Sequence, residues 1–478
     1  MNYSSRLLFS PKGVVLGLLL LASAAILGQG CPPAAPPPDP NSGLTGEYVG
    51  SERCFTCHSR THNEWVETRH HESYNTLVAL GQENNEVCLT CHTTGFQQPG
   101  GFQSINTTEL LANVGCEACH GPARGHVQDV TNRALRPAVS MSADWCARCH
   151  NGFHHDTYSE WAASGHGRVD EHVAEGLSGG SQAQSCGVCH SGDVLLAKNF
   201  NQNIAVSDAL LSGVPIDQIN GTSCSVCHDP HRNTGNAVLP PPGHDFQLRW
   251  PEVTHPEPTN TVAETTNPAR FNLCGQCHHE RGATWTSNAR PPHHSIQANF
   301  FVGEMPAPEG QPPLVPNQRS THRFVQKQCV TCHMQHEAHL TPGLGAQDAT
   351  VSGEMGELTH VGHTFSISSL SGCVGSGCHP SEAVAQADTE RFQAEVQSRL
   401  DAIIARLGPV STWGFSSAGE LPLGGPPANQ QNAIPEPIRK ARWLWTWVAY
   451  DGSLGVHNPP YTRAILTEAE RLLTEAGL

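Results

Sequence analysis

The pentapeptide Cys-x-x-Cys-His occurs eight times in this chain of 478 residues and constrains its fold more than any other feature. The copies are Cys54, Cys57 and His58; Cys88, Cys91 and His92; Cys116, Cys119 and His120; Cys146, Cys149 and His150; Cys186, Cys189 and His190; Cys224, Cys227 and His228; Cys274, Cys277 and His278; and Cys329, Cys332 and His333. A ninth, longer version, Cys-x4-Cys-His, consists of Cys373, Cys378 and His379.

The repeated motif is the attachment site of c-type haem. Its two thiols form thioethers with the porphyrin, and its His becomes the proximal ligand of the iron. Zinc is the rival interpretation of paired Cys, but zinc sites do not need a His after every second Cys. We therefore predict eight haems, and a ninth at Cys373–His379, where a disulfide is the alternative.

Composition agrees with a cofactor-rich interior. Hydrophobic residues make up 37% and aromatic residues 6%, while Gly (46) and Pro (36) are abundant. This composition predicts a mainly α-helical protein with extensive irregular loops that wrap stacked haems, so that much of the core is cofactor. The net charge of −16 argues against nucleic acid as a partner. We expect redox partner proteins instead.

The first residues resemble an export signal. Residues 1–30 combine Arg6 and Lys12 with an apolar run too short to span a membrane comfortably, which predicts a signal peptide. Cys31 follows directly and is the candidate lipid attachment point; plain secretion is the alternative. Residues 31–44 form a Pro-rich tether. Both interpretations place the protein in the periplasm or otherwise outside the cytoplasm.

An internal repeat follows the tether. In two places a haem motif is followed by Glu-Trp-x-x-Ser/Thr-x-His, ending at His70 and at His166, and each copy leads on to two more haem motifs. We predict a first three-haem unit over 45–135, a second over 136–250, and haems seven to nine over 251–385, where no such copy is evident.

The last part of the chain, 386–478, is predicted to be helical. Apolar residues from Phe392 to Leu407 recur at helical spacing, and Gly408-Pro409 ends the run. Residues 412–434 are predicted to be loop. Further helices are predicted over Ile438–Tyr450 and Tyr461–Ala476. We interpret the Trp residues of the middle helix as a packing surface.

The second axial ligand of each iron decides the function. The chain has 29 His but few Met, which favours a second His on each haem. The repeat suggests His166 and His70, and the adjacent His71 competes with His70. The sequence also suggests His126, His231, His322 and His457 as second ligands. At three further places two residues are alternatives: His294 or the adjacent His293, His336 or His339, and His363 or His360. We predict surface or structural roles for His62, His154, His172, His255 and His279, and leave His244 undecided.

These motifs resemble the multihaem cytochromes c that include the tetrahaem cytochromes of nitrifiers, pentahaem nitrite reductase and octahaem hydroxylamine oxidoreductase. The resemblance covers nearly all of 45–478 and is carried by Tyr48–His58, the Trp-x-x-Ser/Thr-x-His element, Cys-His-Gly-Pro and Gly-Val-His457-Asn-Pro. It implies that His457 is a distal ligand and that a Cys-x4-Cys-His haem site is plausible. The nitrite reductases use a proximal Lys at their catalytic haem, whereas all nine motifs here end in His.

Two functions follow from these observations. In the first, mostly bis-His haems carry electrons in the cell envelope, and the chain has no catalytic residues. In the second, one haem keeps an open position and the protein is an oxidoreductase for nitrogen or sulfur compounds, similar to hydroxylamine oxidoreductase. We favour electron transfer because no motif carries the Lys of the nitrite reductases.

Overall fold

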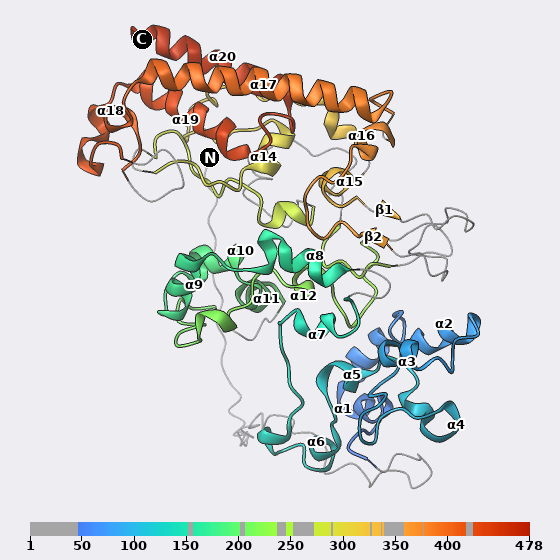
Figure 1. The fold of residues 1–478 in the computed structure, drawn as a ribbon. Coiled ribbons are helices and arrows are strands. Elements are labelled where there is room, and N and C mark those ends of the chain that lie inside the picture. Colours follow the sequence, from blue (N-terminus) through green and yellow to red (C-terminus); the bar gives the residue numbers. More distant parts are fainter. Residues whose placement is uncertain are drawn as a thin grey trace, which may run out of the picture.

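The computed structural model describes residues 46–151, 156–200, 206–236, 245–251, 272–287, 290–325, 327–335, 337–338, 358–375, 377–416 and 424–478. The predicted signal peptide, Cys31 and the tether lie outside these ranges, as do His154, His244, His255, His336 and His339. The described chain rises through successive groups of short helices from its N-terminal part to a long helical layer at its C-terminal end (Figure 1). Mostly helical structure with irregular connections confirms the predicted fold class.

The N-terminal group consists of short helices around a small core. The elements are α1 (Glu52–Trp65), α2 (Ser73–Ala79), α3 (Glu86–His92), α4 (Ile105–Thr108), η1 (Glu109–Leu111), α5 (Cys116–His120), α6 (Arg124–Gln128) and η2 (Arg133–Leu135). Helix α1 is kinked at His58, the last residue of its motif. The buried carboxylate of Glu117 accepts hydrogen bonds from the backbone N–H groups of Val49 and Ala123, which ties the start of this group to α5.

The second group repeats this design. Its elements are α7 (Asp144–Ala147), α8 (Thr157–Ala163), η3 (Gly165–Gly167), α9 (Glu171–Ser178), η4 (Ala183–Gly187), α10 (Val188–His190), α11 (Gly192–Phe200), η5 (Ile216–Gln218) and α12 (Cys224–Cys227). Trp161 Nε1 donates to the carbonyl of Thr222, two residues before Cys224. In the first group Trp65 Nε1 donates to Val114, two residues before Cys116. The same bond therefore joins matching places in both copies.

The third group is the least regular. It contains η7 (Cys274–Gln276), α14 (Gln297–Val302), η8 (Thr321–Phe324), α15 (Cys329–His333), β1 (Glu337–Ala338), β2 (Leu358–His360) and α16 (Ser371–Gly375). The two short strands pair antiparallel, with Glu337 opposite His360. They are the strands of the described part of the chain.

The C-terminal layer consists of long helices. Its elements are α17 (Glu382–Leu407), α18 (Val410–Trp413), η9 (Ala428–Ala433), α19 (Glu436–Asp451) and α20 (Pro459–Glu475). Helix α17 begins where the Ser381 side chain accepts a hydrogen bond from the Val384 N–H, and it ends at Gly408, which has φ 74°. It starts earlier than the apolar spacing predicted. The segment 412–434, which we predicted to be loop, contains η9 and the end of α18.

The largest protein core lies in this layer. Phe392, Val396 and Ile403 of α17 pack with residues of α19 and α20 in one hydrophobic cluster. Trp443 and Trp447 are buried in the same cluster, which confirms the predicted packing role of the Trp residues. The interior is thus less dependent on cofactor here than the low hydrophobic content suggested.

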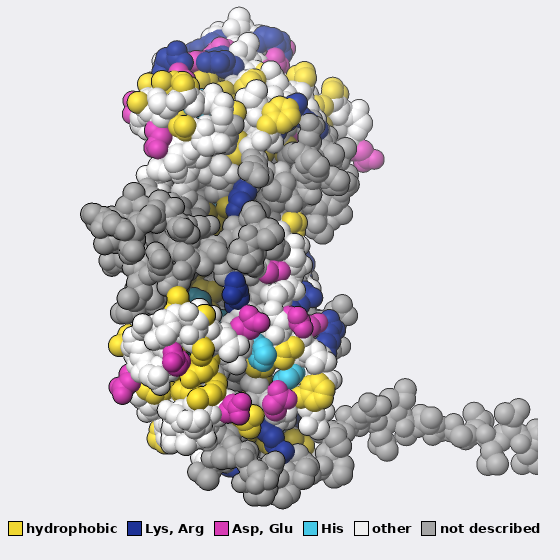
Figure 2. Space-filling model, turned by 90° about the vertical axis from the view of Figure 1, so that its right-hand side faces the viewer, with side chains coloured by type: hydrophobic (Ala, Val, Ile, Leu, Met, Phe, Trp, Pro, Cys, Tyr) yellow, Lys and Arg dark blue, Asp and Glu magenta, His cyan; other side chains and the backbone are white. Residues whose placement is uncertain are grey.

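Charged side chains of both signs are interspersed over one long face of the molecule (Figure 2). In the C-terminal layer several of them form ion pairs, such as Arg399 with Glu470 and Arg463 with Glu395. Among the described residues, no helix is both long and apolar enough to cross a bilayer.

Candidate functional site

The motifs lie in or beside short helical turns, and the first lies in α1, where His58 stands at the kink. The spacing places the two Cys side chains on one face, because residues three apart are neighbours on a helix. The motif in α5, Cys116–His120, and the motif in α15, Cys329–His333, are complete turns. This geometry presents two thiols and an imidazole to one flat group, as attachment of haem requires.

Backbone carbonyls fix the orientation of several motif imidazoles. The Nδ1 atoms lie 2.8 Å from Ser73 O for His92, 2.7 Å from Ala138 O for His120, 2.7 Å from Phe246 O for His228 and 3.0 Å from Phe365 O for His333. Since a carbonyl only accepts, Nδ1 must carry the hydrogen. The other nitrogen, Nε2, is then left with a lone pair for a metal.

Three motif imidazoles have side-chain partners instead. His190 Nδ1 lies 3.0 Å from Asp170, and His278 Nδ1 lies 3.2 Å from Gln297 Oε1. His379 Nδ1 is 3.8 Å from Asp388. The sequence spacing gave no sign of these partners, because they come from other elements or from several turns away.

A second imidazole faces most of the motif imidazoles. Ring centroids are 6.2 Å apart for His70 and His150, 6.1 Å for His231 and His120, 6.1 Å for His166 and His278, 6.5 Å for His363 and His228, and 6.1 Å for His457 and His333. Metal–imidazole bonds of about 2 Å on opposite sides of one ion put the ring centroids about 6 Å apart. The described residues therefore fit an iron ion between each pair.

Other predicted ligands have weaker geometric support. His126, on α6, interacts electrostatically with His58, and His322, in η8, does so with His379. His336 lies outside the described residues. These contacts place His126 and His322 near motif imidazoles.

The site at His190 has two candidate partners. His293 and His294 each have a ring centroid 6.2 Å from that of His190. The three rings form a group whose ligand atoms lie within 4.8 Å of one another. His293 Nδ1 is 2.8 Å from Ser295 Oγ, which itself donates to His279 O, so His293 has its Nε2 lone pair available.

Several remaining His residues occupy structural positions. His62 packs between the rings of Phe55 and Trp65, and His279 accepts a hydrogen bond from the Arg281 N–H. His71, the competitor of His70, packs edge-on against Trp65.

The alternative disulfide at the ninth motif has no support in the described part of the chain. No disulfide joins Cys373 and Cys378 there, and both thiols are at least partly accessible.

Electrostatics favour neutral imidazoles, which metal binding requires. Burial lowers the pKa of His166 to about 4 and also lowers the pKa values of His228 and His278. His457 differs: burial lowers its pKa, but the charge and hydrogen bond of Asp451 outweigh burial, and the pKa of His457 is raised.

The attachment thiols lie against one another across motifs. Numbering the motifs 1 to 9 along the chain, hydrogen-bonding contacts join motifs 1 and 3 (Cys54, Cys116), 2 and 4 (Cys91, Cys149), 4 and 6 (Cys146, Cys224), 5 and 7 (Cys189, Cys277), and 7 and 8 (Cys274, Cys329). Longer-range electrostatic interactions link thiols of motifs 3 and 4 (Cys119, Cys146), 6 and 7 (Cys227, Cys274), and 8 and 9 (Cys332, Cys373).

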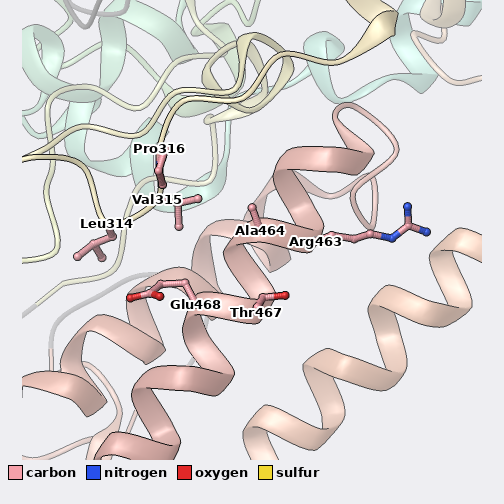
Figure 3. A pocket seen from close by; sticks show the side chains of 7 residues that line it. All are labelled: Leu314, Val315, Pro316, Arg463, Ala464, Thr467 and Glu468. Carbon is pink, nitrogen blue, oxygen red and sulfur yellow. The ribbon is translucent and has the colours of Figure 1, made fainter.

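A small groove lies apart from these sites. It has a volume of about 360 Å³ and lies between residues 314–316 and α20, with Ala464 and Thr467 on its helical side (Figure 3). Arg463, at its edge, is paired with Glu395. The groove holds none of the motif residues.

Comparisons with known proteins agree with the repeated haem-binding geometry. The family "Cytochrome c554 and c-prime" matches residues 53–121, which contain the first three motifs. Cytochrome c-554 of Nitrosomonas europaea is 29% identical over 92 residues, which cover 16% of this chain and 39% of that protein. The multihaem cytochrome MtrA of Shewanella baltica is 26% identical over 178 residues, 33% of this chain and 49% of its own. The chain thus spans less than half the length of these curated relatives.

The solved structure of the Outer Cell Wall Cytochrome OcwA resembles the fold over most of the chain. The TM-score is 0.57, with 89% of this chain and 100% of that chain covered, at 19% identity. This chain is a multihaem c-type cytochrome. Its fold class and its use of c-type haem agree with the sequence analysis.

Sequence reasoning missed the groups that orient the imidazoles of this cytochrome. Asp451 Oδ1 lies 2.6 Å from His457 Nδ1, but in the sequence Asp451 only follows the predicted helix Ile438–Tyr450, and nothing marks it as a partner of His457. Ser-x-His was a usable signal: Ser164 and Ser320 each accept a hydrogen bond from the N–H of the His two residues later. That shared turn orients His166 and His322 alike.

Proposed function

We propose that this cytochrome transfers electrons along a series of nine c-type haems in the cell envelope. The observation that carries the proposal is the set of facing imidazoles with ring centroids 6.1 to 6.5 Å apart. Two axial imidazoles leave no position on an iron for a substrate. Bound haem supplies the one-electron chemistry, and the protein sets its potential through ligands, burial and hydrogen bonds.

The chain's own residues hold the imidazoles ready for this role. Carbonyl partners such as Phe246 O for His228 fix one tautomer and one ring orientation. Burial favours the neutral form of His70 and His166, whose pKa values it lowers. Little reorganisation is then needed when the charge at an iron changes.

Contacts between thiols support an ordered arrangement of the attachment sites. We infer a main line through sites 1, 3, 4, 6, 7, 8 and 9, because hydrogen-bonding or electrostatic interactions between thiols link each site of this line to the next. Sites 2 and 5 contact sites 4 and 7 and form side branches. The line runs from the N-terminal group of helices towards the C-terminal layer.

The branches suggest how the chain is organised. Sites 1–3 and sites 4–6 make the same kinds of contact, which supports three-haem units over 45–135 and 136–250. Sites 7 and 8 repeat the contact between the first and third sites of a unit, through Cys274 and Cys329. We infer that 251–385 holds a third, shortened unit without a middle haem.

A location outside the cytoplasm is part of the proposal. The structurally similar OcwA is named an outer cell wall cytochrome, and residues 1–31 of this chain resemble an export signal followed by a Cys for lipid attachment. We propose redox proteins of the envelope as electron donors and acceptors.

Haem counting together with carbon monoxide binding tests the proposal. We expect the mass and the pyridine haemochrome spectrum of the purified protein to give nine haems. We also expect the spectrum of the ferrous protein to be unchanged by carbon monoxide. A carbon monoxide difference spectrum equal to one haem in nine would overturn pure electron transfer and favour the oxidoreductase, and a mass for eight haems would remove the site at Cys373–His379.

A further inference from the structure

Asp451 gives one of the facing imidazoles an unusual partner. Its Oδ1 atom lies 2.6 Å from Nδ1 of His457, whose ring faces that of His333. The Asp451 side chain is 0% exposed. The motif imidazoles described above meet mainly neutral carbonyl oxygens, so a fully buried carboxylate at this distance sets the His457 site apart.

Two other carboxylates near motif imidazoles are poor equivalents. Asp170 lies 3.0 Å from His190 but its side chain is 55% exposed, and Asp388 lies 3.8 Å from His379 with 45% exposed. Water screens an exposed charge, whereas a buried charge acts through a low dielectric. Only at His457, among these three, is the full negative charge close to the imidazole and shielded from solvent.

The surrounding structure holds this pair in place. Asp451 is the last residue of α19, and Gly452 turns the chain with φ 75°. Ser453 Oγ donates to Asp451 Oδ2 and accepts from the His457 N–H. Asn458 caps α20 and donates to the carbonyl of Gln318 at 2.8 Å. The carboxylate and the imidazole are therefore held between the ends of two packed helices.

A carboxylate that accepts the Nδ1 hydrogen of a ligating imidazole raises the basicity of that ligand. A more basic ligand stabilises the more highly charged, ferric state of the iron. The reduction potential then falls relative to a site with a neutral hydrogen-bond partner.

We propose that Asp451 is a positioning residue that lowers the reduction potential of the haem held between His333 and His457. The inference rests on the proposed electron-transfer function, since it concerns how one site of the series is tuned. Site 8 then forms an uphill step before the last site of the main line, at Cys373–His379.

The test is a potentiometric titration of the full-length, haem-loaded protein, followed by its absorption and electron paramagnetic resonance spectra. Asp451→Asn keeps the shape and the hydrogen bond but removes the charge. We expect the ferric-to-ferrous ratio of one haem to fall about tenfold at fixed potential, an upward shift of about 59 mV for one electron. Asp170→Asn, which neutralises an exposed carboxylate, is the control and should shift the titration much less.

Ser453→Ala provides a test of opposite sign that does not alter Asp451. Losing the Ser453 hydrogen bond leaves more charge on the carboxylate, so the same haem should shift to lower potential. Unchanged potentials in Asp451→Asn or in Ser453→Ala, with haem content intact, would overturn the proposal. Equal shifts in Asp451→Asn and Asp170→Asn would also overturn it. If Asp451→Asn loses haem, the Ser453→Ala variant decides between the outcomes: a shift to lower potential supports the proposal, and a shift to higher potential overturns it. Carbon monoxide binding by the unaltered protein tests the proposed function separately.

Discussion

The Nδ1 atom of each imidazole is the residue-scale feature that distinguishes the candidate sites. Where its partner is a carbonyl, as for His120 and Ala138, the ring is oriented without added charge. Where its partner is a carboxylate, as for His457 and Asp451, orientation and charge come together. Sites with the same two axial residue types can therefore differ in potential.

The two candidate partners of His190 lead to a residue-scale prediction. Because His293 and His294 lie equally far from His190, either can occupy the position when the other is absent. We expect His293→Ala and His294→Ala each to keep every haem low-spin in electron paramagnetic resonance spectra. The double variant should show one high-spin haem that binds carbon monoxide.

The same spectra would also show whether His293 and His294 cannot replace each other as the ligand. A high-spin haem in one single variant only would assign that His as the sole ligand. His172→Ala is a suitable control, because His172 is a histidine of α9 to which we assign no ligand role.

Sequence patterns locate the motifs and the candidate ligands, but not which candidate ligand pairs with which motif. Cys-x-x-Cys-His is a local device, so spacing alone locates it. Which imidazole faces which motif depends on packing between groups, and no periodicity encodes that His231 faces His120. Asp451 could not be found from the sequence because its role depends on the turn that returns the chain to His457.

At the scale of elements, one carboxylate joins segments far apart in sequence. Glu160, in α8, is buried and accepts hydrogen bonds from the backbone N–H groups of Val361 at 2.8 Å and His363 at 2.7 Å. The Glu of the Glu-Trp pair in the second unit therefore positions the segment that presents His363 to His228. In the first unit the matching Glu64 lies near the surface and pairs with Arg60.

Because Glu160 is buried and holds the ligand segment whereas Glu64 is near the surface, the two residues should respond differently to mutation. Glu160→Ala removes two charge-assisted hydrogen bonds, which contribute about 3 kcal/mol locally. We expect the segment around His363 to loosen, so that one haem becomes partly high-spin. Less than one carbon monoxide should then bind per protein molecule. Absorption and electron paramagnetic resonance spectra measure both effects.

Glu64→Ala is the matched control, because it changes the same position of the repeat without a buried contact. Its spectra should match those of the unaltered protein. Equal spectra for both variants would show that Glu160 does not hold the ligand segment.

Helices whose ends depend on nearby residues were easier to predict from the sequence than those that depend on distant contacts. The ends of α17, α19 and α20 are set by capping side chains, Gly and Pro within a few residues, so the sequence located these helices well. The early start of α17 at Glu382 follows the Ser381 cap, which apolar spacing does not report. The short helix α18 buries Trp413, a contact that apolar spacing does not report either.

At the scale of the whole molecule, the main line and its branches should respond differently to the same ligand change. Met ligation raises the potential of a haem. On the main line a high-potential site traps every electron that passes, whereas on a branch it fills once and then no longer hinders transfer. We expect His70→Met, at site 4, to lower the current through single molecules held between electrodes.

The branch comparison uses His293→Met combined with His294→Met, which alters site 5. This variant should carry nearly the same current as the unaltered protein once its branch is reduced. Similar losses of current in both variants would contradict the inferred order of sites.

Facing imidazoles from different groups also have a consequence for biogenesis. His231 follows the sixth motif but faces His120 of the third, and His363 follows the eighth motif but faces His228 of the sixth. Under the proposed export, a chain that leaves the cytoplasm N-terminus first presents His120 for haem attachment before His231 arrives. A newly attached haem would then spend part of maturation with one side unprotected from water, oxidants and small ligands. The order of export would set how long each haem stays exposed.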